Sequence, residues 1–345
     1  AYYSNKYNLS FKVFESSNFV GGNCRTLEMD GFKFDTGAHR FHDKISEVTD
    51  EIKKLLGNNL NKVSAPSKIY WNNQFINFPL QISELLGVLD SATTIKIIKE
   101  ILYNQLFRFK KNNNFKEFAF NKYGKTISDL FLINYTEKLW GTSSDMLSTE
   151  VSGGRLNNLN LFSILKESIF SSNSFNHLDG SFYYPRNGYG EIFDSIKHNI
   201  GEKNIEFNSS IIKLIHNNKK ITKIITKENS INAANNIISS LPINTIINIL
   251  DPKPPLEIQE IISQLSFRSL KLCIFLIDKN SISNNASIYF PSKEIPFTRL
   301  YEPKNRSKYL TPSNQTSIVV EVPYFANSSK NTMDDMLIDN IKLFL

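Results

Sequence analysis

Residues Phe11 to His42 read FKVFESSNFVGGNCRTLEMDGFKFDTGAHRFH, and this stretch decides the fold. It opens with a short apolar run that ends at Phe14, as expected for a buried β-strand, and the next residue is the acid Glu15. In nucleotide-binding α/β folds, an acid at the end of the second strand accepts both hydroxyl groups of an adenosine ribose. The position of Glu15 therefore predicts a nucleotide-binding strand, although a plain strand-to-loop turn explains the same residues.

A glycine pair and a second acidic motif follow Glu15 in a fixed order. Gly21 and Gly22 let the backbone pass close to a bulky ligand because neither residue carries a Cβ atom. Arg25 comes next, and the segment from Asp35 to His39 reads DTGAH. The order of strand, acid, glycine pair, hairpin and Asp-x-Gly-x-His is more specific than any of these features alone.

These residues carry a resemblance to a known family. FESSNFVGGN followed by GFKFDTGAHRFH resembles the second strand and following loop of the FAD-binding flavoenzymes, which include amine oxidases, protoporphyrinogen oxidases and UDP-galactopyranose mutases. GAHRFH is most similar to the mutase branch. The resemblance implies that FAD is the cofactor, with its adenosine ribose on Glu15 and its flavin ring close to His39. The residues expected to bind FAD are Glu15, Gly21, Gly22, Arg25, Gly37, Ala38 and His39.

Two parts of the family's pattern are missing from this sequence. The family carries a GxGxxG loop after its first strand, which places the pyrophosphate at a helix N-terminus, and no such loop precedes Phe11. The chain begins at Ala1 and ends at Leu345 within a helical pattern. We therefore expect a fragment that starts inside a βαβ unit and stops before the closing flavin-covering segment, and that holds FAD poorly by itself.

The composition is that of a folded globular protein. The 345 residues are 41% hydrophobic and 21% charged, which excludes a disordered chain. The net charge of +7 is modest, and the single basic run from Arg108 to Lys111 is too small to predict binding to nucleic acid. Cys24 and Cys273 cannot form a disulfide framework, which predicts a reducing, cytoplasmic location. Neither a metal-type cysteine spacing nor a membrane-length apolar run occurs in the sequence.

The middle of the chain is predicted to be helical. Residues Ile82 to Lys111 and Phe115 to Leu132 carry apolar side chains at helical spacing. An amphipathic stretch that ends in FRFKK fits either a helix on a membrane surface or a core helix with a solvated end. Before it, Lys68 to Phe78 reads as a hairpin with its turn at Asn72-Asn73.

The segment NYTEKLWGTSSDMLSTEVSGGRLN resembles the mutase motif that forms a wall of the substrate site. The resemblance implies that Trp140 stacks on a uracil or sugar and that Lys138 pairs with a phosphate, with Tyr135 and Arg155 nearby. The alternative is that Tyr135 and Trp140 are core residues and Lys138 is solvated. The mutases carry a second arginine where this chain has Leu159, so one diphosphate contact is missing.

A last motif, FTRLYEPKN, resembles the mutase segment in which an arginine faces the substrate diphosphate or the flavin edge, and Arg299 matches that arginine. A guanidinium offers phosphate a bidentate fork. Strict alternation would place Phe297, Arg299 and Tyr301 on one face of a strand. The alternative is an ordinary surface arginine paired with a carboxylate such as Glu302.

The predicted fold class is α/β, with a discontinuous Rossmann-like FAD-binding domain and an α+β substrate domain. The order of motifs gives the FAD-binding domain residues 1–63 and 182–255, and the substrate domain residues 64–181 and 256–330. Residues 331–345 would begin a C-terminal FAD segment. The turn at Gly188 and Gly190 marks the return to the FAD-binding domain, and Ile237 to Pro242 is expected to form a strand of it.

Three functions are consistent with the sequence. The first is an FAD-dependent oxidoreductase of the amine oxidase and protoporphyrinogen oxidase type, with a role in nucleotide-sugar or cell-surface polysaccharide metabolism. The second is a UDP-galactopyranose mutase-like isomerase with no net redox change. The third is a non-catalytic nucleotide or glycan binder. The substitution at Leu159 favours the oxidoreductase, and no acid–base residue can be named from the sequence.

Overall fold

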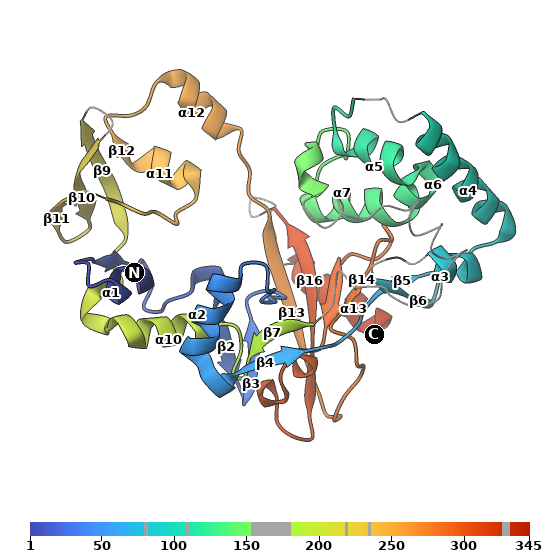
Figure 1. The fold of residues 1–345 in the computed structure, drawn as a ribbon, viewed down its shortest axis with the longest axis horizontal. Coiled ribbons are helices and arrows are strands. Elements are labelled where there is room, and N and C mark those ends of the chain that lie inside the picture. Colours follow the sequence, from blue (N-terminus) through green and yellow to red (C-terminus); the bar gives the residue numbers. More distant parts are fainter. Residues whose placement is uncertain are drawn as a thin grey trace. The chain divides into compact units, whose positions relative to one another are not determined.

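The computed structural model describes residues 1–78, 80, 82–107, 111–152, 181–217, 220–233, 236–325 and 332–345. These residues form two compact units (Figure 1). Unit 1 comprises residues 1–25, 50–57 and 189–267, and unit 2 comprises residues 26–49, 58–188 and 268–345. Helices and sheets occur in both units, which confirms the predicted mixed α/β class.

Unit 1 contains a short parallel strand pair next to two helices. Strand β1 (Val13–Phe14) pairs in parallel with β8 (Ile205–Glu206). The N-terminal helix α1 (Tyr2–Lys6) packs against α10 (Glu191–Ile200). Parallel pairing at Glu15 is the arrangement that the sequence predicts for a nucleotide-binding strand.

The second sheet of unit 1 has the strand order β11-β10-β9-β12. Its strands are β9 (Ile211–Asn217), β10 (Lys220–Thr226), β11 (Ser230–Asn232) and β12 (Leu250–Asp251). Two short helices complete this part of the unit, α11 (Ile243–Ile249) and α12 (Leu256–Ser263).

One predicted strand of unit 1 is absent from the structure. Residues 237–242 form no strand, and the α11 helix begins directly after Pro242. Ile238 is 96% exposed, and no described strand pairs with this segment. The prediction of a strand there was wrong because apolar residues alone do not make a strand when no neighbouring strand completes its hydrogen bonds.

Unit 2 is built on a six-stranded sheet with the order β13-β16-β15-β14-β5-β6 (Figure 1). All neighbouring strands in it are antiparallel except β14 and β5, which are parallel. The strands are β5 (Ser67–Trp71), β6 (Gln74–Phe78), β13 (Ser269–Ile277), β14 (Ser287–Tyr289), β15 (Arg299–Tyr301) and β16 (Thr316–Tyr324).

The two faces of this sheet carry different hydrophobic clusters. Cluster 1 includes Ile69 and Tyr289 from the sheet, together with residues of the helices that follow β6. Cluster 2 includes Ile288 of β14, which precedes Tyr289, and Leu300 of β15. Because side chains alternate between faces along a strand, Arg299 lies on the face of Tyr289, not on the face of Leu300.

The helical part of unit 2 packs into cluster 1. It contains α3 (Ile82–Val88), α4 (Ser91–Leu106), α5 (Phe115–Tyr123), α6 (Lys125–Ile127), a π-helical turn (Ser128–Ile133) and α7 (Asn134–Trp140). The Asp90 carboxylate caps α4 by accepting the Thr93 N–H. Ile97 and Ile101 of α4 are buried in cluster 1. Residues 108–110 of the FRFKK stretch lie outside the described residues, so membrane contact there stays a prediction. No helix in the described ranges is long and apolar enough to cross a membrane.

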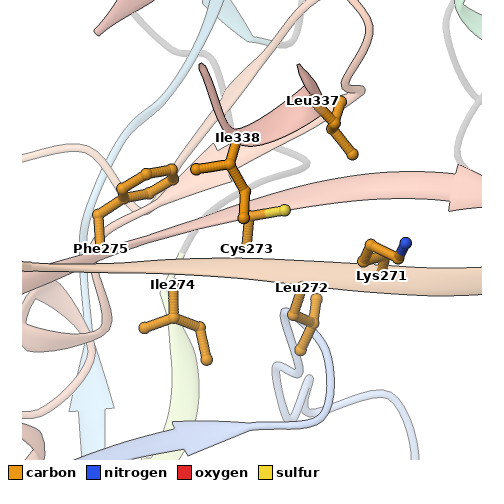
Figure 2. Close-up of a pocket in the computed structure, with 7 residues that line it drawn as sticks. All are labelled: Lys271, Leu272, Cys273, Ile274, Phe275, Leu337 and Ile338. Atoms are coloured by element: carbon orange, nitrogen blue, oxygen red, sulfur yellow. The ribbon is translucent and has the colours of Figure 1, made fainter. Parts of the chain in front are cut away.

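Helix α13 (Thr332–Phe344) covers cluster 2, where its Ile341 is fully buried. A pocket lies between this helix and β13 (Figure 2). Cys273 and Phe275 face Ile338 there, whereas Leu272 and Ile274 point to the other side of the strand (Figure 2). Apart from Lys271, the described residues of its lining carry no charged side chain.

Two antiparallel hairpin-like pairs complete unit 2. Strand β2 (Thr26–Met29) pairs with β3 (Phe32–Asp35), and β4 (Leu60–Val63) pairs with β7 (Phe182–Pro185). Gly188 follows β7 with φ +106°, and a Cβ atom there would lie 2.4 Å from the Thr26 hydroxyl. The backbone at Gly188 therefore passes close to Thr26, which a glycine permits, whereas Gly190 has an ordinary helical φ of −60°.

The compact units differ from the predicted domain boundaries in several places. Residues 26–49, 58–63 and 182–188 belong to unit 2, because the β2–β3 and β4–β7 pairs lie there. Residues 332–345 also belong to unit 2, because α13 is buried against cluster 2.

Candidate functional site

The predicted ribose-binding acid, Glu15, directly follows β1 in unit 1. One carboxylate oxygen, Oε1, accepts the Ser17 N–H at 2.9 Å and the Ser17 hydroxyl at 2.8 Å. The hydroxyl of Ser16 donates to the same oxygen at 3.3 Å. No described residue donates to the second oxygen, Oε2. The carboxylate is thus held in place by its own loop while one oxygen stays open, which fits an acceptor for ribose hydroxyls.

The glycine pair of unit 1 adopts backbone conformations that favour glycine. Gly21 has φ +94° and Gly22 has φ +52°. A Cβ atom on Gly21 would lie 3.4 Å from the Phe193 side chain of α10. Nothing lies within 4 Å of the position that a Cβ atom would take on Gly22. Arg25 stacks its guanidinium 4.1 Å from the centre of the Phe19 ring. The turn therefore needs these glycines, and their contact with FAD stays a prediction.

In unit 2, the predicted flavin-binding loop from Gly37 to His39 forms a tight turn. The His39 N–H donates to the Gly37 carbonyl oxygen at 2.8 Å. A Cβ atom on Gly37 would lie 3.4 Å from two atoms of the His39 ring. The imidazole thus folds back over the Gly37 backbone.

Two contacts anchor this loop to the sheet of unit 2. The Ala38 N–H donates to Oε1 of Glu321 on β16 at 3.0 Å. The Arg40 guanidinium donates through Nη2 to the hydroxyls of Ser67 at 3.0 Å and Ser287 at 2.9 Å. The loop is therefore fixed by hydrogen bonds on both sides of His39.

Four charged groups surround His39. Burial lowers the pKa of His39; Asp35 and Glu321 act against this, and Arg306 and Arg299 lower it further. The net effect is a pKa below the ordinary value, so the imidazole is neutral at neutral pH. A neutral imidazole can donate one hydrogen bond and accept another.

Asp35 lies at the end of β3 in a buried polar network. Its Oδ1 accepts the Thr26 hydroxyl at 2.7 Å, and its Oδ2 accepts the Tyr184 hydroxyl. Burial and the nearby Asp35 carboxylate hold the pKa of Tyr184 well above its usual range. The Arg306 guanidinium is 3% exposed and lies 4.1 Å from the centre of the Tyr301 ring. These buried hydrogen bonds and the ring contact hold Asp35 in place beside the His39 loop.

Arg299 on β15 forms a buried ion pair with Glu321. Its Nε lies 2.7 Å and its Nη2 lies 2.6 Å from Oε2 of that carboxylate. Burial alone lowers the pKa of Arg299, but the Glu321 charge outweighs it, and the pKa is raised. The alternative of an arginine paired with a carboxylate is thus observed, but the partner is not Glu302, which accepts the Thr316 hydroxyl and the N–H groups of residues 282 and 283.

Two tyrosine rings lie next to Arg299, and we call Arg299, His39, Tyr289 and Tyr135 the wall around Arg299. The guanidinium lies 5.9 Å from the centre of the Tyr289 ring, and Tyr135 meets Tyr289 edge to face at 6.0 Å. The structure thus brings together two predicted substrate residues, Arg299 and Tyr135. The prediction that Phe297 shares their face was wrong: it is fully buried in cluster 2, because β15 and its alternation begin only at Arg299.

The remaining predicted substrate residues have different surroundings. Lys138 donates three hydrogen bonds, at 2.6, 2.8 and 2.9 Å, to the carbonyl oxygens of Phe290, Ser292 and Ile295. Burial lowers its pKa to about 8. Lys138 is therefore not solvated. Trp140 is 42% exposed, so it is not a core residue. Arg155 and Leu159 lie outside the described residues, and the substrate contacts of the whole set stay a prediction.

Sequence reasoning missed the acids and the second cation of this site. Glu321 was available as a signal, because it is the one charge in the apolar strand SIVVEVPY and buried carboxylates are normally paired. Asp35 stands in the DTGAH motif and was not assigned a role of its own. Arg306 and Tyr184 carried no comparable signal, since they reach the site through packing between distant segments.

The sequence as a whole matches a known family. A sequence model of the family described as flavin containing amine oxidoreductase matches residues 4–337 of this chain. The match includes the Glu15 strand, the glycine pair, the His39 loop and Arg299.

Solved structures share the fold at low sequence identity. A reduced UDP-galactopyranose mutase superposes with a TM-score of 0.85 and 20% identity, covering 99% of this chain and 74% of that chain. A protein from Exiguobacterium sp. 255-15 named as a protoporphyrinogen oxidase has a TM-score of 0.75 and 13% identity, with coverage of 99% and 79%. A putrescine oxidase bound to putrescine has a TM-score of 0.57 and 16% identity, with coverage of 96% and 72%.

Proposed function

Because the chain belongs to the flavin-containing amine oxidoreductases, we propose that it is an FAD-dependent oxidoreductase that removes a hydride from a carbon next to nitrogen or oxygen. The predicted fold class, a Rossmann-like FAD-binding fold with an α+β substrate part, is confirmed by the family match and the shared fold. The reaction and the substrate are the parts that we propose.

The residues present fit FAD in both units. Glu15 offers an open carboxylate oxygen for the adenosine ribose, and Gly21 and Gly22 keep the following turn free of side chains. Gly37 and His39 form the tight turn that we expect next to the flavin ring. When bound, FAD supplies the hydride acceptor, and the protein supplies binding, orientation and charge.

The observation that carries the oxidoreductase is the composition of the wall around Arg299. This wall combines a neutral imidazole, two tyrosine rings and a cation that is already paired with Glu321. An uncharged substrate group, or an amine that the tyrosine faces attract, packs well there. Because Glu321 already takes the Nε and Nη2 edge of Arg299, the attraction of this wall for a diphosphate is reduced.

The experiment is an anaerobic test of the oxidised, FAD-loaded protein. Amines and alcohols are added one class at a time, and loss of the visible absorbance of oxidised flavin is recorded. Reduction by a member of one class supports the proposal. A protein that no such substrate reduces, but that isomerises a nucleotide sugar once its flavin is reduced with dithionite, contradicts it.

A UDP-galactopyranose mutase-like isomerase is the second candidate, and one observation favours it. The fold match with the mutase has the higher TM-score, 0.85 against 0.57 for the putrescine oxidase. In this alternative Arg299 would contact a diphosphate. The two candidates differ in a measurable way, because only the isomerase needs reduced flavin and consumes no oxidant.

A further inference from the structure

Helix α4 of unit 2 carries apolar side chains on two opposite faces. Its inner face, with Ile97 and Ile101, is buried in cluster 1. Its outer face includes five apolar side chains that are between 48% and 74% exposed, namely Ile95, Leu102, Tyr103, Leu106 and the adjoining Phe107. At 3.6 residues per turn, all five lie on the side of the helix opposite Ile97 and Ile101. In Figure 1, α4 lies at the outer edge of the helical part of unit 2.

The charges on this outer face are all positive. Lys96 and Lys99 lie in the same stripe and are exposed. Glu100 is the one acid of α4, and its carboxylate bonds to α6, where it accepts the Thr126 N–H at 2.7 Å and the Thr126 hydroxyl at 2.8 Å. The face of a helix that meets water normally consists of charged and polar residues. An apolar stripe with lysines and without an acid therefore indicates a partner that is both apolar and negatively charged.

We propose that the outer face of α4, from Ile95 to Phe107, is a docking surface for a membrane that contains anionic phospholipid. The helix lies along the membrane surface, because its 16 residues are fewer than the roughly 20 that a membrane-spanning helix needs. Its apolar side chains enter the boundary between headgroups and acyl chains, and the Lys96 and Lys99 ammonium groups reach the lipid phosphates. This binding is separate from the flavin reaction proposed above.

An aromatic pair at the end of α4 fits the same partner. Tyr103 and Phe107 are one helical turn apart, and the centres of their rings lie 4.7 Å from each other. Their side chains are 58% and 59% exposed. A tyrosine ring has an apolar body and a polar hydroxyl, which suits the boundary between membrane and water.

A second copy of this chain fits the outer face less well. A two-fold symmetric contact uses the same surface on both copies. It would bring the Lys96 and Lys99 side chains of both copies into one interface, where the outer face supplies no carboxylate to pair with them. Anionic lipid headgroups supply that charge, so the membrane is the occupant that matches both the apolar side chains and the lysines.

Helix α12 of unit 1 provides a matched comparison. Leu256 and Ile261 are 74% and 58% exposed, as Leu106 and Phe107 of the outer face are 74% and 59% exposed. The charged residues of α12 are both acids, at positions 257 and 260. An anionic surface attracts α4 and repels α12, so charge separates two helices with similar apolar exposure.

The test is sedimentation of the purified chain with two kinds of vesicle, one of phosphatidylcholine alone and one of an equal mixture of phosphatidylcholine and phosphatidylglycerol. We expect the mixed vesicles to bind at least about tenfold more tightly, and added salt to weaken this binding. Replacing Lys96 and Lys99 by glutamine should weaken it about fivefold for each lysine.

The variant with both Leu106→Gln and Phe107→Gln should lose binding to the mixed vesicles. Both side chains are exposed, so we expect an unchanged circular dichroism spectrum. Leu256→Gln combined with Ile261→Gln is the control and should bind as the unmodified chain does.

Four results would overturn the proposal. They are no binding to the mixed vesicles, equal binding to both kinds of vesicle, an equal loss of binding in the control, and a dimer in vesicle-free solution that the Leu106→Gln and Phe107→Gln variant dissociates. The last result would assign the outer face to a second copy of the chain. None of these measurements uses the flavin, so their outcome is distinct from that of the reduction test.

Discussion

The two units of this protein hold their predicted cofactor-binding residues in different ways. In unit 2 the strand that carries Glu321 is buried along most of its length, and hydrogen bonds to three strands fix the His39 loop. In unit 1 no residue of α12 is buried, and among the described residues only the serines that follow Glu15 bond its carboxylate. The predicted residues of unit 2 are therefore fixed by a buried sheet, whereas those of unit 1 depend on backbone turns and one acid.

The largest expected difference between the units is in the free energy of unfolding that one aromatic ring contributes. Phe297→Ala in unit 2 should lower the free energy of unfolding by about 3–5 kcal/mol, because it empties a fully buried ring from cluster 2. Phe267→Ala is the matched change in unit 1, where the ring is 54% exposed, and it should cost within about 0.5 kcal/mol. Urea unfolding followed by circular dichroism measures both. Equal losses of unfolding free energy in the two variants would contradict this difference between the units.

A smaller effect is expected in unit 1, on binding and not on folding. Glu15→Ala should weaken FAD about tenfold or more, since charged hydrogen bonds contribute about 1.5–3 kcal/mol each. The unfolding midpoint of the apoprotein should stay unchanged, because the carboxylate bonds only its own loop. Glu202→Ala, an exposed acid of the same unit, is the control. If flavin fluorescence titration gives one affinity for all three proteins, Glu15 is not the ribose acid.

The smallest effect concerns pH in unit 2. The folded protein lowers the pKa of His39, so the stability that its neutral form contributes is complete above the ordinary value of about 6.5. That contribution is lost as the pH falls from about 6.5 through the lowered folded pKa, with a slope of at most about 1.4 kcal/mol per pH unit. His39→Gln should flatten this part of the stability curve. An equally steep curve in the variant would mean that another group titrates there.

Local sequence signals predicted much of the fold. The Asn72-Asn73 hairpin is confirmed, with φ of +48° and +58° at the turn, and α4 and α5 lie within the two ranges that apolar spacing predicts to be helical. The family match also confirms the fold class, because the motifs occur in the expected order.

The predictions that the structure does not bear out concern contacts between residues far apart in the chain. The alternative to a substrate role for Arg299 was pairing with a carboxylate such as the neighbouring Glu302, but the carboxylate that it pairs with is Glu321, 22 residues away on the next strand. Glu321 also bonds Ala38 over a separation of 283 residues, which no local pattern encodes. Residues 237–242 have the composition of a strand but lack a described neighbour with which to pair.

The three carbonyl groups that surround the Lys138 ammonium have a consequence for how this chain can vary. They come from the connection between β14 and β15, at residues 290, 292 and 295, and they enclose the cation as a crown ether encloses ammonium. The hosts are backbone atoms, so the exposed side chains of that connection, at residues 293, 294 and 296, can change without loss of these contacts, whereas Phe290 and Phe297 are buried in cluster 2. The length of the connection cannot change, because one inserted or deleted residue would move a carbonyl out of reach and leave one N–H of the buried ammonium without an acceptor. The Lys138 side chain on α7 thus fixes the length of the connection between β14 and β15.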